Sequence, residues 1–131
     1  MMVLVDTTVW IDLFSASPYP HVKTLETLIV DREDICLCGI ILTEVLQGIR
    51  EVSEFNRTWD LFANLVFLPM QYYVFLRSAE IYRNLRRKGI TVRKPVDCMI
   101  AAVAIENDIP LLHNDKDFDT IKNNLGLKTL S

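Results

Sequence analysis

Apolar positions along the chain alternate between short runs typical of β-strands and longer stretches with helical spacing. The short runs, rich in Val, Ile and Leu, predict strands at residues 3–5, 35–38, 66–70, 109–112 and 127–130. Between them, apolar residues recur every three or four positions, which predicts helices at residues 7–14, 21–31, 39–50, 54–63, 72–88, 96–107 and 118–123. Repeated strand and helix units indicate an α/β protein with a mostly parallel sheet covered on both faces.

The two long helices predicted in the second half of the chain differ in how they are buried. The helix at 72–88 has a single apolar stripe and ends before Gly89. The stripe consists of Val74, Phe75, Ser78, Ile81, Tyr82 and Leu85. The helix at 96–107 is rich in alanine and apolar almost all round, so we expect it to lie inside the core.

Length and composition are those of one domain spanning residues 1–131. Half of the 131 residues are apolar, which is enough to fill a single core. No apolar run approaches the roughly 20 residues of a membrane span, and no signal-type segment opens the chain, so a cytoplasmic location is expected. Cys36, Cys38 and Cys98 match no zinc spacing and are expected to be buried, reduced thiols.

Five acidic residues stand where strands end or helices begin, apart from one inside a helix. Asp6 follows the first strand and can cap the next helix; Asp97 lies in the first turn of its helix, and Asp115 and Asp117 precede the last helix. Each of these has a structural explanation on its own. Glu44 is harder to explain in this way, because it lies in an apolar helix where an unpaired carboxylate is costly.

Parallel sheets bind ligands beyond the carboxyl ends of their strands, which is where Asp6 and Asp115 are placed. Carboxylates gathered there repel one another unless a cation compensates, and a hard divalent metal is the usual one. The sequence therefore predicts a metal-dependent enzyme that acts on phosphodiesters.

The net charge of −3 is unusual for an enzyme that binds nucleic acid. However, if the five acids are assigned to the site, the 14 basic residues outnumber the remaining acidic ones, so the rest of the surface is mildly basic. Six basic residues fall within residues 83–94. Such a cluster is often only a solvated helix end, but Arg86 and Arg87 are also candidates for contacts with RNA phosphates.

Four segments together resemble the PIN-domain ribonucleases, and most closely the VapC toxins of toxin–antitoxin pairs. They are Val-Asp6-Thr7-Thr8-Val-Trp-Ile-Asp, Leu-Thr-Glu44-Val-Leu-Gln-Gly, Pro-Val-Asp97-Cys-Met-Ile-Ala-Ala and Asn-Asp115-Lys-Asp117-Phe. They span nearly the whole chain in the order and spacing of that family. The resemblance implies a three-layer α/β/α fold around a central, mostly parallel sheet of about five strands.

The resemblance also implies roles for individual residues. Asp6, Glu44, Asp97 and Asp115 would be the acidic quartet that holds Mg²⁺ or Mn²⁺ and cleaves RNA, with Asp117 as a supporting carboxylate and Thr7 as the hydroxyl residue beside the substrate. Asp6 and Asp97 would ligate directly, whereas Glu44 and Asp115 would act through water or complete a second metal position about 4 Å away. Attack by water leaves a 5′-phosphate and a 3′-hydroxyl. One departure is His113, where family members often have Thr.

The partners implied by the resemblance are an RNA substrate, a cognate antitoxin of the VapB kind that inhibits the enzyme, and a second copy in a homodimer. Three alternatives stay open. A catalytically weak PIN-like domain would only bind a protein partner, and His21 with His113 could support metal-free cleavage through the RNA 2′-hydroxyl. A phosphoacceptor receiver domain fits poorly, because the middle strand ends in Leu68, Pro69 and Met70 rather than in an acceptor Asp.

Overall fold

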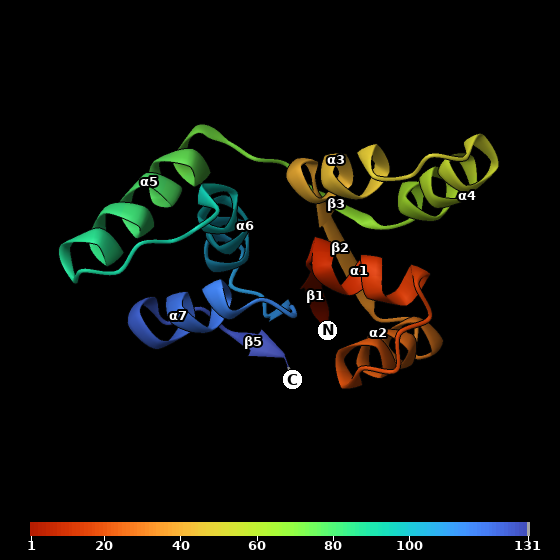
Figure 1. The fold of residues 1–131 in the computed structure, drawn as a ribbon, viewed down its shortest axis with the longest axis horizontal. Helices are drawn as coiled ribbons and strands as arrows, with labels where there is room; N and C mark the ends of the chain where they lie inside the picture. Colours follow the sequence, from red (N-terminus) through yellow and green to blue (C-terminus); the bar gives the residue numbers. More distant parts are fainter. Residues whose placement is uncertain (131) are drawn as a thin grey trace.

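The computed structural model describes residues 1–130, which form a five-stranded sheet and seven helices. The strands are β1 (Met2–Val5), β2 (Asp34–Cys38), β3 (Val66–Leu68), β4 (Leu111–Leu112) and β5 (Thr129–Leu130). The helices are α1 (Thr7–Phe14), α2 (Pro20–Val30), α3 (Gly39–Gln47), α4 (Val52–Ala63), α5 (Tyr72–Arg87), α6 (Pro95–Glu106) and α7 (Lys116–Leu125). Helices α1–α4 lie on one side of the sheet and α5–α7 on the other (Figure 1). The expected three-layer α/β/α fold is therefore confirmed.

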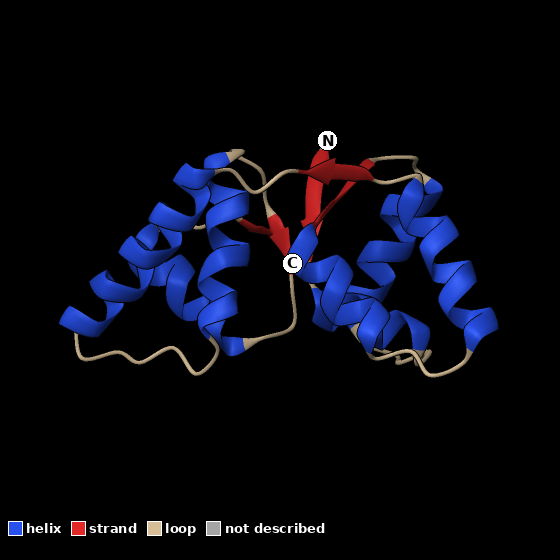
Figure 2. Ribbon diagram, turned by 90° about the horizontal axis from the view of Figure 1, so that it is seen from above, coloured by secondary structure: helices blue, strands red, loops and turns tan. Residues whose placement is uncertain are grey.

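All strand pairs in the sheet are parallel, in the order β3-β2-β1-β4-β5. The chain builds outward from β1 to β2 and β3, and then crosses to the other side of β1 to add β4 and β5. The strand order thus reverses between β1 and β4, and such a switch point is where open parallel sheets bind ligands. Figure 2 shows the sheet between the two groups of helices.

The burial of the strands and helices largely follows the apolar pattern of the sequence. Strand β1 is buried from Val3 to Val5, β4 is wholly buried, and α6 buries most of its length as the alanine-rich pattern predicted. Helix α5 packs chiefly against α6 through Val74, Ser78, Ile81 and Leu85. One residue of the predicted stripe was misplaced, since Phe75 is 48% exposed. The three cysteines are buried and free, as expected.

Several predicted elements are shorter in the structure, for identifiable reasons. The third strand ends at Leu68 because Pro69 has no backbone N–H to continue the ladder. The third helix ends at Gln47, before Gly48, rather than at Arg50. The last two strands pair over only two residues each, Leu111–Leu112 with Thr129–Leu130. Gly89 ends α5 as predicted, and its φ of 77° is one that glycine adopts without strain.

Candidate metal centre at the carboxyl edge of the sheet

Asp6 lies at the switch point of the sheet. Its backbone N–H donates to the Leu112 carbonyl oxygen at 2.9 Å, which places it beside the end of β4. Its carboxylate caps α1, because Oδ2 accepts hydrogen bonds from the backbone N–H (3.1 Å) and the hydroxyl (2.6 Å) of Thr8. Asp6 is only 3% exposed, and burial raises its pKa, with a smaller contribution from the charge of Glu44.

Thr7 connects this aspartate to the third helix. The Thr7 hydroxyl donates a hydrogen bond of 2.8 Å to Oε1 of Glu44, which is half-buried on α3. The semi-buried glutamate expected from the sequence is thus found, and its partner is a hydroxyl rather than a basic side chain. No other hydrogen bond or ion pair of the Glu44 carboxylate occurs among the described residues, so Oε2 remains available as an acceptor.

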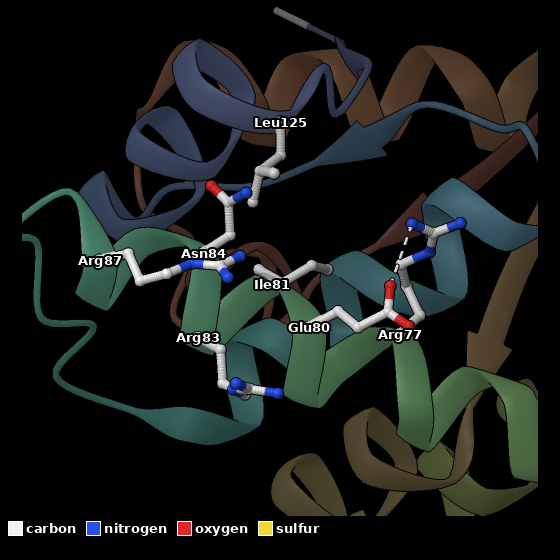
Figure 3. Close-up of a pocket in the computed structure, with 7 residues that line it drawn as sticks. All are labelled: Arg77, Glu80, Ile81, Arg83, Asn84, Arg87 and Leu125. Atoms are coloured by element: carbon white, nitrogen blue, oxygen red, sulfur yellow. Dashed lines mark ion pairs between the residues drawn. The ribbon is translucent and has the colours of Figure 1, made fainter.

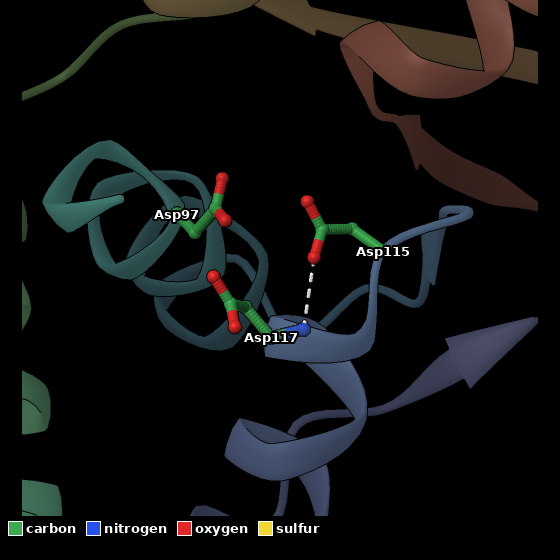
Figure 4. Close-up of side chains that lie close together, drawn as sticks. All are labelled: Asp97, Asp115 and Asp117. Carbon is green, nitrogen blue, oxygen red and sulfur yellow. Dashed lines mark hydrogen bonds between the residues drawn. The ribbon is translucent and has the colours of Figure 1, made fainter. Parts of the chain in front are cut away.

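Three aspartates from two other elements converge across the site. Asp97 lies in the first turn of α6, Asp115 is the N-cap of α7, and Asp117 lies in the first turn of α7. One carboxylate oxygen from each lies within 4.8 Å of the others. Figure 4 shows the three carboxyl groups facing a common space, with Asp115 Oδ1 accepting the backbone N–H of Asp117 at 2.9 Å.

Two oxygens of these three aspartates (Asp97, Asp115 and Asp117, called here the aspartate triad) lack hydrogen-bond donors. Oδ2 of Asp97 and Oδ2 of Asp117 are buried and receive no hydrogen bond among the described residues. Burial, together with the nearby aspartate charges, raises the pKa of Asp97 to about 7, even though the Lys94 ammonium acts in the opposite direction. The triad therefore has more negative charge than its surroundings compensate.

Two basic residues next to the triad were not singled out by the sequence. Lys94 Nζ lies 2.8 Å from Asp115 Oδ2 and 3.8 Å from Asp97 Oδ2. Arg93 lies farther away, at 3.8 Å from both Asp115 Oδ1 and Asp117 Oδ1. Although burial alone would raise it, the bonds from Lys94 and from the Asp117 N–H hold the pKa of Asp115 below its usual value. The sequence signal that could have identified Lys94 was its spacing, since Lys94 precedes Asp97 by three residues at a helix start.

A second polar network holds α1 against the loop that follows β4. The Thr8 hydroxyl accepts the backbone N–H of Asn114 at 3.1 Å, and the Asn114 side chain donates to Asp12 Oδ2 at 3.3 Å. The same Asp12 oxygen lies 2.5 Å from Nε2 of His21. This network joins three elements around Asp6. It also gives His21 a structural partner, which weakens the metal-free alternative.

His113 is the residue at which the chain departs from the family pattern that its sequence resembles, in which Thr is frequent. Its Nδ1 accepts the backbone N–H of Asp115 at 3.1 Å, and its ring packs against Phe118 at a centroid distance of 5.1 Å. Burial lowers the pKa of His113, which favours the neutral ring that this acceptor role requires. His113 therefore shapes the turn that presents Asp115.

The predicted site residues thus fall into three groups. Asp97, Asp115 and Asp117 are brought together closely; Asp6 lies at the adjoining strand end with Thr7 and Glu44. Asp6 is linked to the triad electrostatically, since its charge contributes to raising the pKa of Asp97. Arg86 and Arg87 are exposed at the end of α5 instead. Arg86 lies 5.8 Å from the centre of the Tyr82 ring, and Arg87 lines a groove of about 290 Å³ beside α7 (Figure 3).

The chemistry of this donor set fits a hard divalent cation. The polar atoms that face one another are carboxylate oxygens, and two of them are buried without donors. The charge of Asp97 is disfavoured without a compensating ion. The oxygens come from helix starts and a strand end, which are rigid elements. Fold and site together define an α/β protein with an acidic centre at its topological switch point.

Comparison with known proteins agrees with that class. The profile of the PIN domain matches residues 3–124. The chain is 33% identical to a VapC ribonuclease of Mycobacterium bovis and to ribonuclease VapC11 of Mycobacterium tuberculosis, over 99% of this chain and 98% of theirs. The chain therefore belongs to the PIN-domain family, as its sequence motifs indicated.

Solved structures show the same fold at lower sequence identity. VapBC2 from Rickettsia felis, bound to a DNA fragment, matches with a TM-score of 0.78 and 20% identity over 99% of this chain and 98% of that one. FitAcB from Neisseria gonorrhoeae matches with a TM-score of 0.75 and 22% identity over 99% and 97%. These similarities establish the architecture.

Proposed function

We propose that this protein is a metal-dependent endoribonuclease of the VapC kind, which hydrolyses RNA at the acidic centre and is inhibited by a cognate antitoxin. The observation that carries the proposal is the convergence of Asp97, Asp115 and Asp117, with two buried carboxylate oxygens that receive no hydrogen bond. The full-length relatives at 33% identity are ribonucleases by name, which supports RNA as the substrate.

The cation is Mg²⁺ or Mn²⁺, both of which prefer oxygen ligands. Asp97 and Asp6 would ligate it directly, with Asp115 and Asp117 beside Asp97 and with Glu44 completing the acidic set at the adjoining strand end. Once bound, the metal supplies Lewis-acid stabilisation of the phosphate and lowers the pKa of an attacking water. Cleavage then leaves a 5′-phosphate and a 3′-hydroxyl.

The protein's own residues orient the reaction. Thr7 holds Oε1 of Glu44, so that Oε2 is directed to accept a proton from water. Thr8 holds Oδ2 of Asp6 through two hydrogen bonds and keeps that carboxylate in one orientation. The substrate is gripped by Arg86 and Arg87 along the strand. These arginines bind phosphates and carry no sequence information. Thr7 acts beside the reacting phosphate by holding Glu44, to which its one hydroxyl proton is donated.

A partly apolar groove beside the site supports the proposal that an antitoxin binds there. A cavity of about 420 Å³ runs from Glu44 along α1 and α3, and its apolar lining includes Ile11, Phe14, Val45 and Ile49. Ile11 is 49% exposed and Phe14 is 38% exposed, so both are available to a partner segment. Such a segment fits the helix-in-groove mode of recognition. Homodimerisation, which the resemblance of the sequence implies, is part of the proposal.

Among residues 1–130, none of the helices combines the length and apolarity needed to cross a membrane. We place the action of the protein in the cytoplasm, with RNA as its substrate.

The test is cleavage of end-labelled RNA by purified protein with Mg²⁺, with a chelator, and with Asp6→Asn. The proposal requires cleavage that depends on the metal and is lost in the variant, with 5′-phosphate ends on the products. Cleavage that continues in the chelator and leaves 2′,3′-cyclic phosphate would favour the histidine mechanism instead. Absence of cleavage together with tight antitoxin binding would favour the catalytically weak, partner-binding alternative.

A further inference from the structure

Lys94 lies where its charge reaches the same carboxylates that would hold the metal ion. Its ammonium Nζ is 2.8 Å from Asp115 Oδ2, a hydrogen-bonding distance, and 3.8 Å from Asp97 Oδ2. The second of these oxygens is the buried one that receives no hydrogen bond. The ammonium therefore lies between the two helices that carry the triad, α6 and the start of α7.

The backbone of Lys94 is fixed, whereas its ammonium is free to move. Lys94 is the N-cap of α6, followed at once by Pro95, so its backbone is held at the helix start. Its side chain is 50% exposed, on a flexible four-carbon stem. The ammonium can therefore leave the carboxylates for solvent without any movement of the backbone.

Arg93 does not share this arrangement. Its two contacts with Asp115 and Asp117 are both 3.8 Å long, beyond hydrogen-bonding distance, and its side chain is 73% exposed. Lys94 is the one basic residue among the described ion pairs that makes a close bond to the triad.

We propose that Lys94 is a built-in counter-ion of the metal-free site, and that its ammonium competes with the divalent cation for Asp97 and Asp115. The inference rests on the proposed function, because it takes the triad as the metal site. A metal ion held by Asp97 and Asp115 would need carboxylate lone pairs toward which the ammonium now points. Two cations sharing those oxygens would repel each other strongly, so the ammonium must turn outward when the ion enters.

Two consequences follow from this competition. Lys94 lowers the metal affinity of the protein, since each binding event has to displace its contact. Lys94 also stabilises the metal-free protein, because it offsets repulsion among three aspartates that would otherwise lack a close cation. A substitution that removes the ammonium should therefore have opposite effects on metal affinity and on metal-free stability.

The experiment measures Mn²⁺ binding to the chelator-stripped protein. Binding is measured by calorimetry and by the decrease of the free Mn²⁺ signal in electron paramagnetic resonance. Lys94→Met removes the charge and keeps most of the side-chain volume, and Lys94→Gln serves if the first variant folds poorly. Lys94→Arg retains the charge. The matched control is Lys116→Met, which removes an exposed positive charge beside the same aspartates in sequence, from a residue that forms none of the described ion pairs with them.

Lys94→Met is expected to bind Mn²⁺ about fivefold more tightly, the size of one partly exposed ion-pair contact. Lys94→Arg and Lys116→Met should stay within about twofold of the unaltered protein. In thermal unfolding, the metal-free Lys94→Met variant should melt at a lower temperature, and added Mn²⁺ should raise its midpoint more than it raises that of the unaltered protein.

Three outcomes would overturn the inference. Equal or weaker Mn²⁺ binding by Lys94→Met, while the unaltered protein binds the ion, would refute competition and leave the proposed metal site intact. Equal tightening by Lys116→Met would show a general charge effect rather than direct contact. If neither the unaltered protein nor Lys94→Met binds Mn²⁺, the metal site of the proposed function falls, and this inference falls with it.

Discussion

The hydroxyl of Thr7 donates a 2.8 Å hydrogen bond to Oε1 of Glu44, joining the first residue of α1 to the middle of α3. Thirty-seven positions separate the two residues in the chain. They meet because β1 and β2 are neighbours and both lead into helices at the same edge of the sheet. The bond orients a glutamate that would otherwise rotate freely at the border of an apolar helix.

Thr7→Val should therefore lower the rate of RNA cleavage with little loss of fold. A hydrogen bond to a charged group contributes about 1.5 to 3 kcal/mol, so we expect a loss of roughly tenfold to hundredfold in kcat/KM. The measurement is steady-state cleavage of a labelled RNA at saturating Mg²⁺. Thr7→Ser, which keeps the hydroxyl, should retain most activity. Full activity of Thr7→Val would show that the orientation of Glu44 by Thr7 does not contribute to cleavage.

The metal-free protein should lose stability as the pH rises from about 4 to 7. The pKa of Asp97 is raised from 3.8 to about 7 in the folded state, chiefly by burial, so the folded chain holds a proton that the unfolded chain releases in this range. The contribution of Asp97 to stability then falls with rising pH by at most about 1.4 kcal/mol per pH unit, and Asp6, whose pKa burial also raises, contributes in the same direction. Urea unfolding in a chelating buffer at several pH values measures the slope.

Asp97→Asn should make that slope shallower, because one of the groups that cause it is gone, while Asp6, whose pKa burial also raises, remains. Asp115 acts in the opposite direction: its pKa is lowered, so the stability it contributes is lost only as the pH falls below its ordinary value of 3.8. Its effect thus lies outside the window. Saturating Mg²⁺ should also flatten the slope, since a bound cation favours the charged carboxylate. An unchanged slope in Asp97→Asn would assign the titration to another group.

The order of elements could be predicted from the sequence because each strand and helix has its own apolar period. The sequence could not show how deeply each helix face is covered, and Phe75 illustrates the limit. Its spacing places it beside Val74 and Ser78, yet it lines an open groove between α5 and the start of α6 and stays 48% exposed. Which positions of a stripe become buried depends on how the neighbouring helix docks, and that is a property of the tertiary structure.

The acidic residues could be named from the sequence because they stand at strand ends and helix starts, where backbone geometry fixes their direction. Their distances from one another could not be predicted. Nor could the role of Lys94, since its proximity to Asp115 depends on how α6 docks against α7. The same holds for Asp12, whose contacts with Asn114 and His21 join segments far apart in the chain.

Asp6→Asn should separate stability from activity. Asparagine can keep the N-cap acceptor, and it removes a buried charge whose pKa is already raised by burial. We expect the metal-free variant to melt at the same temperature or a few degrees higher, while cleavage falls at least about 100-fold, the equivalent of roughly 3 kcal/mol of lost metal-assisted stabilisation. Differential scanning calorimetry and the RNA assay on one preparation test both. A large drop in melting temperature would instead make Asp6 primarily a structural cap.

Arg87→Ala should weaken RNA binding in a salt-dependent way. The groove that Arg87 shares with Asn84 and Leu125 also contains Arg77, which is paired with Glu80 at 3.6 Å (Figure 3). Arg77 is also held by Glu106 at 2.7 Å. No ion pair among residues 1–130 involves Arg87, so its charge is available to a phosphate.

Each phosphate contact on single-stranded RNA contributes about 0.7 to the slope of log affinity against log salt. Arg87→Ala should reduce that slope by about this amount, uniformly across RNA sequences. The measurement is fluorescence anisotropy at several salt concentrations, in the Asp6→Asn background so that the RNA stays intact. Arg57→Ala, which removes an exposed arginine on α4, is the matched control. Equal slopes for the two variants would place the RNA away from the end of α5.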